Sequence, residues 1–460
     1  LDKVTIEQAI NNINSAINNL NGEAKLTKAK EDAVASINNL SGLTNEQKTK
    51  ENQAVNGAQT RDQVANKLRD AEALDQSMQT LRDLVNNQNA IHSTSNYFNE
   101  DSTQKNTYDN AIDNGSTYIT GQHNPELNKS TIDQTISRIN TAKNDLHGVE
   151  KLQRDKGTAN QEIGQLGYLN DPQKSGEESL VNGSNTRSEV EEHLNEAKSL
   201  NNAMKQLRDK VAEKTNVKQS SDYINDSTEH QRGYDQALQE AENIINEIGN
   251  PTLNKSEIEQ KLQQLTDAQN ALQGSHLLEE AKNNAITGIN KLTALNDAQR
   301  QKAIENVQAQ QTIPAVNQQL TLDREINTAM QALRDKVGQQ NNVHQQSNYF
   351  NEDEQPKHNY DNSVQAGQTI IDKLQDPIMN KNEIEQAINQ INTTQTALSG
   401  ENKLHTDQES TNRQIEGLSS LNTAQINAEK DLVNQAKTRT DVAQKLAAAK
   451  EINSAMSNLR

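Results

Sequence analysis

The stretch MQTLRD at residues 78–83 decides the fold, because it returns at a fixed interval along the chain. It recurs as MKQLRD at 204–209, MQALRD at 330–335 and MSNLR at 456–460, a step of 126 residues each time. The same step links further sets: Tyr97, Tyr223 and Tyr349; Tyr108, Tyr234 and Tyr360; Pro125, Pro251 and Pro377; Gly22, Gly148, Gly274 and Gly400. Since the register never slips, the chain is a tandem array of one 126-residue repeat.

The composition favours many small helical units over one large domain. Only 31% of the 460 residues are hydrophobic and 2% are aromatic, whereas a single globular domain of this length would need a larger apolar core. The net charge of −18 argues against a nucleic-acid partner, because an acidic surface repels phosphates. No apolar run approaches the roughly 18 residues of a membrane span, so we expect no membrane contact by this segment.

Apolar residues recur at helical spacing throughout the period. The expected helices carry, in turn, Tyr108, Ala111 and Ile112; Ile132, Ile136, Ile139 and Leu146; Leu152, Ala159, Ile163 and Leu166; and Val181. From Thr60 to Asn89 no glycine or proline interrupts the pattern, which predicts one helix of roughly 30 residues and about 45 Å. The sequence therefore predicts an all-α fold: tandem three-helix bundles in an elongated rod, with adjacent bundles sharing this long helix.

Capping residues predict where the helices begin and end. Thr60 with Gln63 and Thr186 with Glu189 have the spacing of capping boxes, as do Ser130 with Asp133, Ser256 with Glu259 and Asn382 with Glu385. Asp171-Pro172 is typical of an N-cap followed by proline in the first turn. We expect Gly148 and its counterparts to end helices and to mark the junction at which the array bends more easily.

The order of these features resembles two known module families. The pattern Ser95, Tyr97, Tyr108, Ala111, Pro125, Ile132, Ile136, Leu146 and Gly148 resembles the FIVAR module, and residues 152–200 resemble the three-helix GA module of bacterial albumin-binding domains. Their alternation with a fixed period resembles the giant extracellular-matrix-binding proteins of staphylococci. The expected modules are 1–22 (the end of a FIVAR-like module), then GA-like 23–83, 149–209, 275–335 and 401–460, alternating with FIVAR-like 84–148, 210–274 and 336–400.

This resemblance implies a bacterial cell-surface adhesin that binds host extracellular matrix, with fibronectin or another matrix protein as the partner. It also implies that the chain is a monomeric segment of a longer protein, with the signal peptide and the anchor outside it. Albumin-binding GA modules carry aromatic residues around their second helix, whereas here only Tyr168 is aromatic near that position. We therefore expect little albumin binding.

Few residues are candidates for a ligand site. Tyr97, Tyr108, Tyr223, Tyr234, Tyr349 and Tyr360 could form a ligand-facing patch, but the pattern favours bulk in a thin core with hydroxyls at the surface. The acids of 99–101 and 351–353 lack a calcium-loop spacing and suit helix starts, and the histidines are too scattered for a metal site. Arg82 in the recurring Leu-Arg-Asp phrase is either a contact epitope or, more in keeping with its acidic neighbours, one partner of an ion pair where bundles meet.

Nothing in the sequence supports catalysis. It has no cysteine, no glycine-rich phosphate loop and no repeated combination of serine, histidine and acid. We therefore expect no enzyme, no cofactor and no catalytic or metal-binding residues. Three hypotheses remain: a rod-like spacer that also binds matrix weakly and multivalently, a structural wall-associated rod with no soluble ligand, and a GA-type serum-protein binder.

Overall fold

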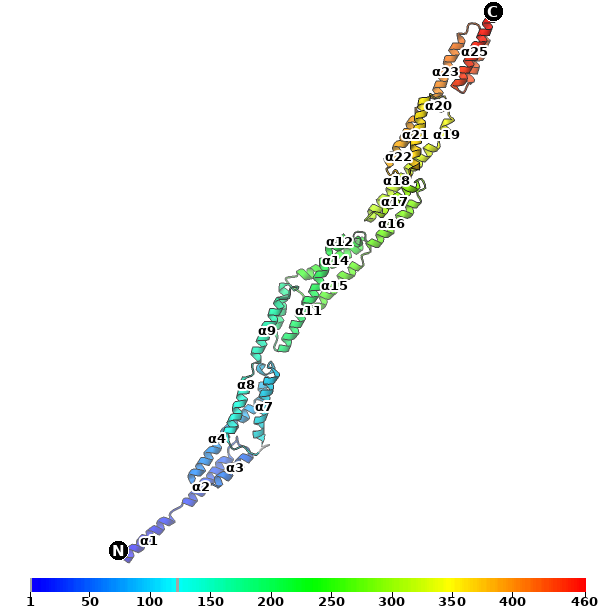
Figure 1. Cartoon of the computed structure of the whole chain (residues 1–460). Helices are drawn as coiled ribbons and strands as arrows, with labels where there is room; N and C mark the ends of the chain where they lie inside the picture. The colour runs from blue at the N-terminus through cyan, green and yellow to red at the C-terminus, as the bar shows by residue number, and fades with distance from the viewer. Residues whose placement is uncertain (1, 121–123) are drawn as a thin grey trace. The chain divides into compact units, whose positions relative to one another are not determined.

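The computed structural model describes residues 2–120 and 124–460, and among these residues the only regular secondary structure is helical (Figure 1). The helices are α1 (Lys3–Asn18), α2 (Gly22–Asn38), α3 (Asn45–Asn56), α4 (Arg61–Asn86), α5 (Gln88–His92), α6 (Ser95–Phe98), α7 (Ser102–Thr120), α8 (Lys129–Asn144), α9 (Gly148–Gly164), α10 (Asp171–Gly183), α11 (Arg187–Ala212), α12 (Lys214–Gln219), α13 (Ser221–Ile224), α14 (Thr228–Asn246), α15 (Lys255–Asn270), α16 (Gly274–Asn290), α17 (Asp297–Gln308), α18 (Ile313–Gly338), α19 (Gln340–His344), α20 (Ser347–Phe350), α21 (Glu354–Asp372), α22 (Lys381–Thr396), α23 (Gly400–Glu416), α24 (Thr423–Gln435) and α25 (Arg439–Leu459). The predicted all-α class is confirmed. The predicted rod shape stays a prediction.

The chain divides into two compact units, residues 1–211 with 240–263, and residues 212–239 with 264–460. In the first unit, α2, α3 and α4 lie side by side as a GA-like bundle around Ala33, Ile37 and Val55. Helices α4, α7 and α8 form the FIVAR-like bundle that follows, and α9, α10 and α11 form the next GA-like bundle. The second unit repeats this order with α16, α17 and α18, then α18, α21 and α22, then α23, α24 and α25.

One helix is shared by two neighbouring bundles, as the sequence predicts. In α4, Val64 and Ala71 are buried in the GA-like core, whereas Leu74, Met78 and Leu81 are buried in the FIVAR-like core. Helix α18 is divided in the same way between its two cores. Each shared helix is 26 residues long rather than roughly 30, because α4 ends at Asn86 and the short α5 begins at Gln88.

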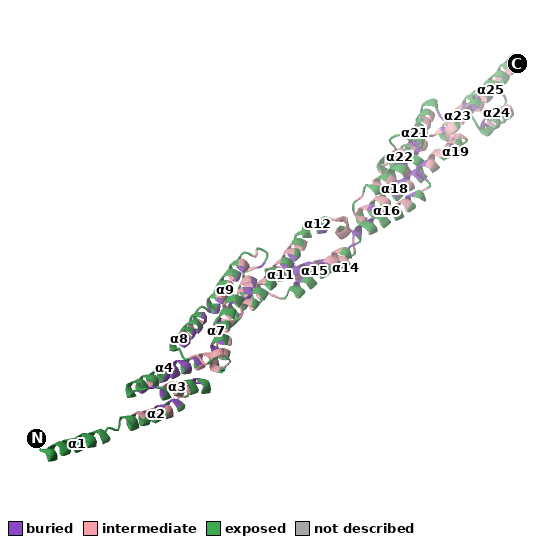
Figure 2. Ribbon diagram, turned by 60° about the horizontal axis from the view of Figure 1, so that its bottom comes forward, coloured by how far each residue is buried: buried purple, intermediate pink, exposed green. Residues whose placement is uncertain are grey.

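Helix α1 is exposed along its whole length (Figure 2). Its apolar residues Ile6 and Ile13 occupy the register positions of Ile132 and Ile139 in α8, which are buried. The same residue types are therefore core or surface according to whether partner helices surround them.

Several expected helix ends are wrong, and the structure gives the reason. Helix α8 begins at Lys129, and its N-cap is Asn128, two residues before the expected serine cap Ser130. Asp133 instead accepts a hydrogen bond from Ser77 Oγ at 2.7 Å. In the other two copies, Asn254 and Asn380 are the capping residues in place of the expected Ser256 and Asn382. An asparagine two residues earlier forms a short side-chain turn onto the backbone, and this displaces the capping box.

Other expected caps are confirmed or displaced by one residue. Thr60 and Thr186 form capping boxes with Gln63 and Glu189. The N-cap of α10 is Asn170 rather than Asp171, and Pro172 lies in the first turn.

One glutamine joins each GA-like bundle to the FIVAR-like turn that packs on it. Gln299 Oε1 accepts from the Asn296 backbone N–H at 3.0 Å, and its Nε2 donates to the Ile378 carbonyl at 2.9 Å. Gln47 and Gln173 bond the carbonyls of Glu126 and Thr252 in the same manner. All three side chains are fully or almost fully buried. Each glutamine therefore holds the turn of the FIVAR-like module in place against the GA-like bundle.

Replacing Gln299 should loosen this attachment locally. Gln299→Ala leaves the Asn296 N–H and the Ile378 carbonyl without their partner, which costs about 1–3 kcal/mol. We expect faster hydrogen exchange at the Asn296 amide, measured by NMR or mass spectrometry. Gln301→Ala, at an exposed position of the same helix, is the control. Equal exchange in both variants would contradict the role given to Gln299.

Candidate functional site at the module junctions

A buried asparagine fastens each FIVAR-like module to the GA-like module that follows. In the first unit, Asn99 Nδ2 donates to the Asn185 carbonyl at 3.0 Å, and Asn99 Oδ1 accepts from the Arg187 backbone N–H at 3.0 Å. Arg187 is the first residue of α11, so the carboxamide satisfies one of the helix-start amides that have no partner within a helix. We call this pair of hydrogen bonds the Asn clasp.

The Asn clasp is present in all three copies of the junction. Asn225 bonds the Gln311 carbonyl and the Ile313 amide at 3.0 and 2.9 Å, and Asn351 bonds the Lys437 carbonyl and the Arg439 amide, both at 3.0 Å. Asn99, Asn225 and Asn351 are between 2% and 5% exposed. An uncharged bidentate contact of this kind depends little on salt, since it involves no net charge.

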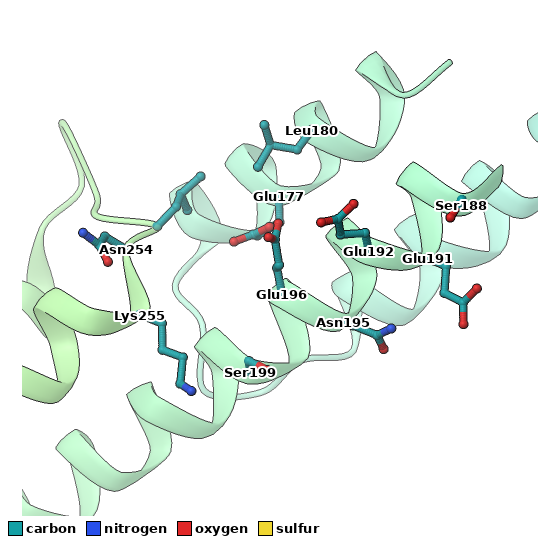
Figure 3. Close-up of a pocket in the computed structure, with 11 residues that line it drawn as sticks. Glu177, Leu180, Ser188, Glu191, Glu192, Asn195, Glu196, Ser199, Asn254 and Lys255 are labelled. Atoms are coloured by element: carbon teal, nitrogen blue, oxygen red, sulfur yellow. The ribbon is translucent and has the colours of Figure 1, made fainter. Parts of the chain in front are cut away.

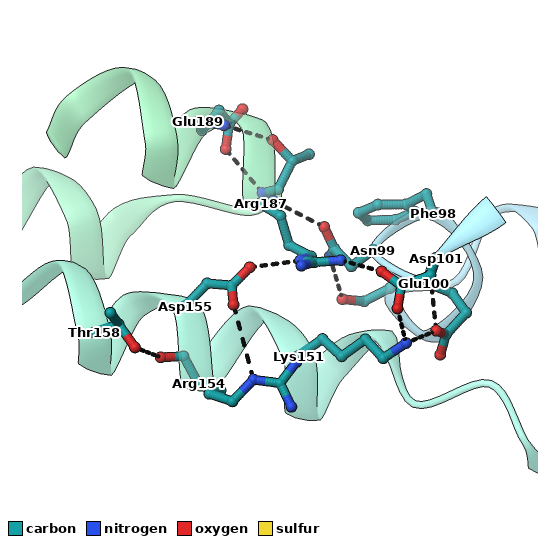
Figure 4. Close-up of polar contacts among 12 residues, drawn as sticks. Phe98, Asn99, Glu100, Asp101, Lys151, Arg154, Asp155, Thr158, Arg187 and Glu189 are labelled. Carbon is teal, nitrogen blue, oxygen red and sulfur yellow. Dashed lines mark hydrogen bonds and ion pairs between the residues drawn. The ribbon is translucent and has the colours of Figure 1, made fainter. Parts of the chain in front are cut away.

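Charged residues surround the clasp in two of the three copies (Figure 4). Arg187 bonds Asp101 Oδ1 through Nη1 at 2.7 Å and Asp155 Oδ2 through Nε at 2.5 Å. Lys151 Nζ contacts both Glu100 and Asp101. We call these five side chains the charged ring; it ties the loop before α7 to both α9 and α11.

The last junction has the same charged ring, and the middle one does not. Arg439 bonds Asp353 and Asp407 at 2.7 and 2.6 Å, and Lys403 contacts Glu352 and Asp353. In the middle copy, Leu277, Ala281 and Ile313 stand at the positions of the lysine, the second aspartate and the arginine. There Asp226 accepts from the Gln273 backbone N–H at 2.5 Å and contacts His230 Nδ1 at 3.0 Å.

A buried glutamate has its pKa lowered by the charged ring. Burial by itself raises the pKa of Glu352, but hydrogen bonds from Lys403 and from the Ser399 and Asp353 amides outweigh burial and lower it to about 2. The pKa of Glu100 is lowered for the same reasons by Lys151 and the Asp101 and His147 amides. The acids at 99–101 and 351–353 therefore do more than start helices, because Glu100 and Glu352 contact Lys151 and Lys403 of the next module.

The glycine of each junction begins a helix, so the expectation that it ends one is wrong. Gly148 and Gly400 are the first residues of α9 and α23. A Cβ on Gly148 would lie 2.6 Å from the carbonyl oxygens of Ser95 and Asn96, and one on Gly400 would lie 2.6 Å from the Asn348 carbonyl oxygen. Close approach of two backbones at the junction explains the recurring glycine.

Within the described part of the chain, Arg82 and Arg334 of the recurring Leu-Arg-Asp phrase form no ion pair, so the expected ion pair at this position is wrong. Arg82 Nε donates to the Gly42 carbonyl at 3.0 Å, and Arg334 Nε donates to the Ala294 carbonyl at 2.8 Å. Each arginine lies on the shared helix and bonds a loop of the preceding GA-like bundle. It does join bundles, but through a carbonyl rather than a carboxylate.

The candidate tyrosines lie in two different environments. Tyr108, Tyr234 and Tyr360 are 1% exposed, whereas Tyr97, Tyr223 and Tyr349 are half-buried. The Tyr97 hydroxyl donates to Asp109 at 2.6 Å, and burial followed by this contact raises its pKa to about 12. The His92 ring stacks on Tyr97 and contacts the other oxygen of Asp109 at 2.7 Å.

The junction residues were visible in the sequence but were not recognised as a site. Asn99, Asn225 and Asn351 share one register position, but a recurring asparagine does not by itself indicate a contact with the next module. The pairing of the acids with Lys151 and Arg187, some 50 and 86 residues further on, is a tertiary contact. Among the described residues no group of three or more histidines, cysteines and acids is placed to hold a metal ion, and no helix is long and apolar enough to cross a membrane.

Adding one methyl group should open a junction. Gly400→Ala places a Cβ against fixed backbone, so the loop must move away and the Asn351 hydrogen bonds lengthen or break. We expect the Ser399 and Arg439 amides to exchange faster by a factor that corresponds to about 2 kcal/mol. Gly22→Ala is the matched control, because nothing lies within 4 Å of a Cβ there. Unchanged exchange in Gly400→Ala would show that the close approach is not required.

Acid should weaken the charged ring. The folded pKa of Glu352 is about 2 and its ordinary value is 4.5, so its contribution to stability is complete above pH 4.5 and is lost as the pH falls towards 2. We expect the Ser399 amide to lose exchange protection across this window, and Glu352→Gln to remove this pH dependence. A pKa near 4.5 for the Glu352 carboxyl, measured by NMR, would contradict the role given to the charged ring.

Two families of known modules match the chain from residue 23 to residue 455. The GA module family matches residues 23–77, 149–203, 275–329 and 401–455, and the FIVAR domain family matches residues 77–147, 203–273 and 329–399. The two families meet at residues 77, 203 and 329, each within one of the long helices α4, α11 and α18.

Relatives align along the whole chain. Extracellular matrix-binding protein EbhA of Staphylococcus aureus strain Newman is 34% identical over all 460 residues, which are 13% of its length, and Ebh of strain USA300 is 34% identical over the same residues, 4% of its length. The chain thus spans a small part of each relative.

Two solved structures are similar in part. A domain of EbhA from S. aureus covers 53% of this chain and 98% of that one, with 26% identity and a TM-score of 0.49. The other structure is described as part of the characterisation of Embp-mediated adherence of Staphylococcus epidermidis to fibronectin. It covers 27% of this chain and 98% of its own, with 35% identity and a TM-score of 0.27. The chain is therefore an array of alternating GA and FIVAR modules, and it is 34% identical along its whole length to the extracellular matrix-binding proteins Ebh and EbhA of S. aureus.

Proposed function

We propose that the chain is a segment of a bacterial cell-surface adhesin, acting as a rod-like spacer that also binds host extracellular matrix weakly and at many points. One observation carries the spacer role: in each unit, successive modules are fastened on both sides. The GA-to-FIVAR step uses a shared helix and a buried glutamine, and the FIVAR-to-GA step uses the Asn clasp.

Fastened junctions suit a spacer because bending must break specific contacts. A flexible linker would let modules fold back on each other, whereas a shared helix transmits direction from one bundle to the next. Stiffness holds a distal region away from the cell. It also presents near-identical faces at regular intervals, so that weak contacts add up through avidity.

The proposed partner is fibronectin or another host matrix protein, and the names of the relatives support this class of partner. We propose that the segment is a monomer on the outside of the cell, with the signal peptide and anchor elsewhere in the full protein. We also propose that it has no enzymatic activity, since the sequence offers no catalytic combination of residues and the Asn clasps and charged rings join modules.

Two alternatives make different predictions. A purely structural wall-associated rod would share the shape but bind no soluble ligand. A GA-type serum-protein binder would need apolar aromatic side chains on the second helix. The one aromatic nearby, Tyr168, is partly exposed in the loop before α10, and the centroid of its ring lies 5.5 Å from the Lys205 ammonium. We therefore favour the matrix-binding rod.

Small-angle scattering of the whole chain tests the spacer role. A rod of stacked bundles should extend to roughly 200 Å, whereas a compact particle of 460 residues would have a radius of gyration of about 23 Å. A compact particle would refute the rod. Capture of purified fibronectin on beads that carry the chain, with albumin as the parallel probe, separates the matrix binder from both alternatives.

A further inference from the structure

The second GA module has a groove lined by four glutamates, a set that no other GA module of the chain has. A cavity of about 840 Å³ opens between α10, α11 and the segment 253–255, and it is lined by Glu177, Glu191, Glu192 and Glu196 together with polar and apolar residues (Figure 3). Its volume lies within the range that holds small ligands and single side chains. All of its lining residues belong to the first unit.

The groove contains a buried carboxylate oxygen without a partner. Glu177 is only 2% exposed, and its Oε2 has no hydrogen-bond partner. In Figure 3 the Glu177 and Glu196 carboxylates lie next to each other at the centre of the groove. Leaving a buried carboxylate unpaired is costly, and a second carboxylate beside it increases the cost.

The positive groups nearby leave the Glu177 oxygen unpaired. Lys255 lines the groove but lies 3.4 Å from Glu259 on its own helix, and His193 contacts Glu196 at 3.1 Å. Burial, followed by the charge of Glu196, raises the pKa of Glu177 to about 7, and His193 lowers it only in part. A cation placed between the two carboxylates would relieve both the burial cost and the repulsion.

The repeat itself shows that these acids are not required for folding. Ala303 and Leu322 occupy the positions of Glu177 and Glu196 in the third GA module, whose bundle has the same helices. Asn317 and Gln318 replace the other two glutamates there. The first GA module keeps Glu51 and Asp70 at the positions of Glu177 and Glu196, but there the charge of Lys67 opposes the rise in the pKa of Glu51 that burial causes. The full set of four glutamates occurs in the second module alone, and its cost to stability suggests a separate role.

We propose that this groove is a docking site for a lysine side chain on a basic segment of a partner protein. Leu180 and Leu253 line the groove and can pack against the methylene stem of the lysine. The ammonium then lies between Glu177 and Glu196, and Asn195, Ser199 and Asn254 offer hydrogen bonds to the partner's backbone. The proposal is independent of the spacer role, because it concerns one copy of the array, and the other copies lack the set of four glutamates.

The test uses the whole 460-residue chain and a short peptide of four lysines with blocked ends. Isothermal titration calorimetry near 150 mM salt should show one saturable site per chain. Glu177→Gln with Glu196→Gln should weaken binding at least tenfold. Glu23→Gln with Glu401→Gln, which makes the same change in net charge at exposed positions of other modules, should leave it unchanged. The same peptide with acetylated lysines should not bind.

Three results would overturn the proposal. Equal weakening in both double variants would mean that the peptide binds through the overall net charge of −18 and not at the groove. Displacement of the peptide by millimolar Ca²⁺, with calcium bound at one site that Glu177→Gln removes, would assign the groove to a metal ion. No saturable binding would mean that the groove has no cationic occupant. Circular dichroism confirms folding of both variants, for which the third GA module is the natural precedent.

Discussion

The carboxamide of a single asparagine is the contact on which each FIVAR-to-GA junction depends. It accepts from the first amide of a long helix and donates to the carbonyl just before that helix, so it fixes where the helix starts relative to the preceding module. Bundles with thin cores have little apolar surface left for contacts between modules. The array therefore uses buried polar contacts at its junctions, where each hydrogen bond is directional and defines one geometry.

The junctions vary around this constant element. The first and last copies add a charged ring of two acids on the loop, an acid on the next helix, a lysine and an arginine, whereas the middle copy has apolar residues at three of these positions. Ion pairs of partly exposed side chains contribute modestly and are weakened by salt. Copies of one repeat can thus differ in junction strength while keeping the same backbone path. The acidic groove of the second GA module is variation of the same kind, on a face instead of a junction.

Much of the fold followed from the sequence, for reasons that particular residues make clear. The period came from Met78 and its counterparts, and the shared helix came from the uninterrupted apolar pattern between Thr60 and Asn89. Those signals are local or repeat at a fixed step. The cap at Asn128 was not predicted because several polar residues near it could serve as the N-cap. The helix start at Gly148 was not predicted because the glycine is required by the close approach of backbone from another segment. The charged ring joins residues some 50 and 86 positions apart, which no local pattern reveals.

The central claim is that a FIVAR module and the GA module after it are held in one geometry by the Asn clasp. Since the chain has no cysteine, spin labels can be attached at Asp113→Cys on α7 and Ser179→Cys on α10, both exposed positions of the first unit. Electron–electron double resonance should give one narrow distance distribution between these labels. Asn99→Ala, which removes both hydrogen bonds of the clasp, should broaden it. A broad distribution in the chain with an intact clasp would contradict the account.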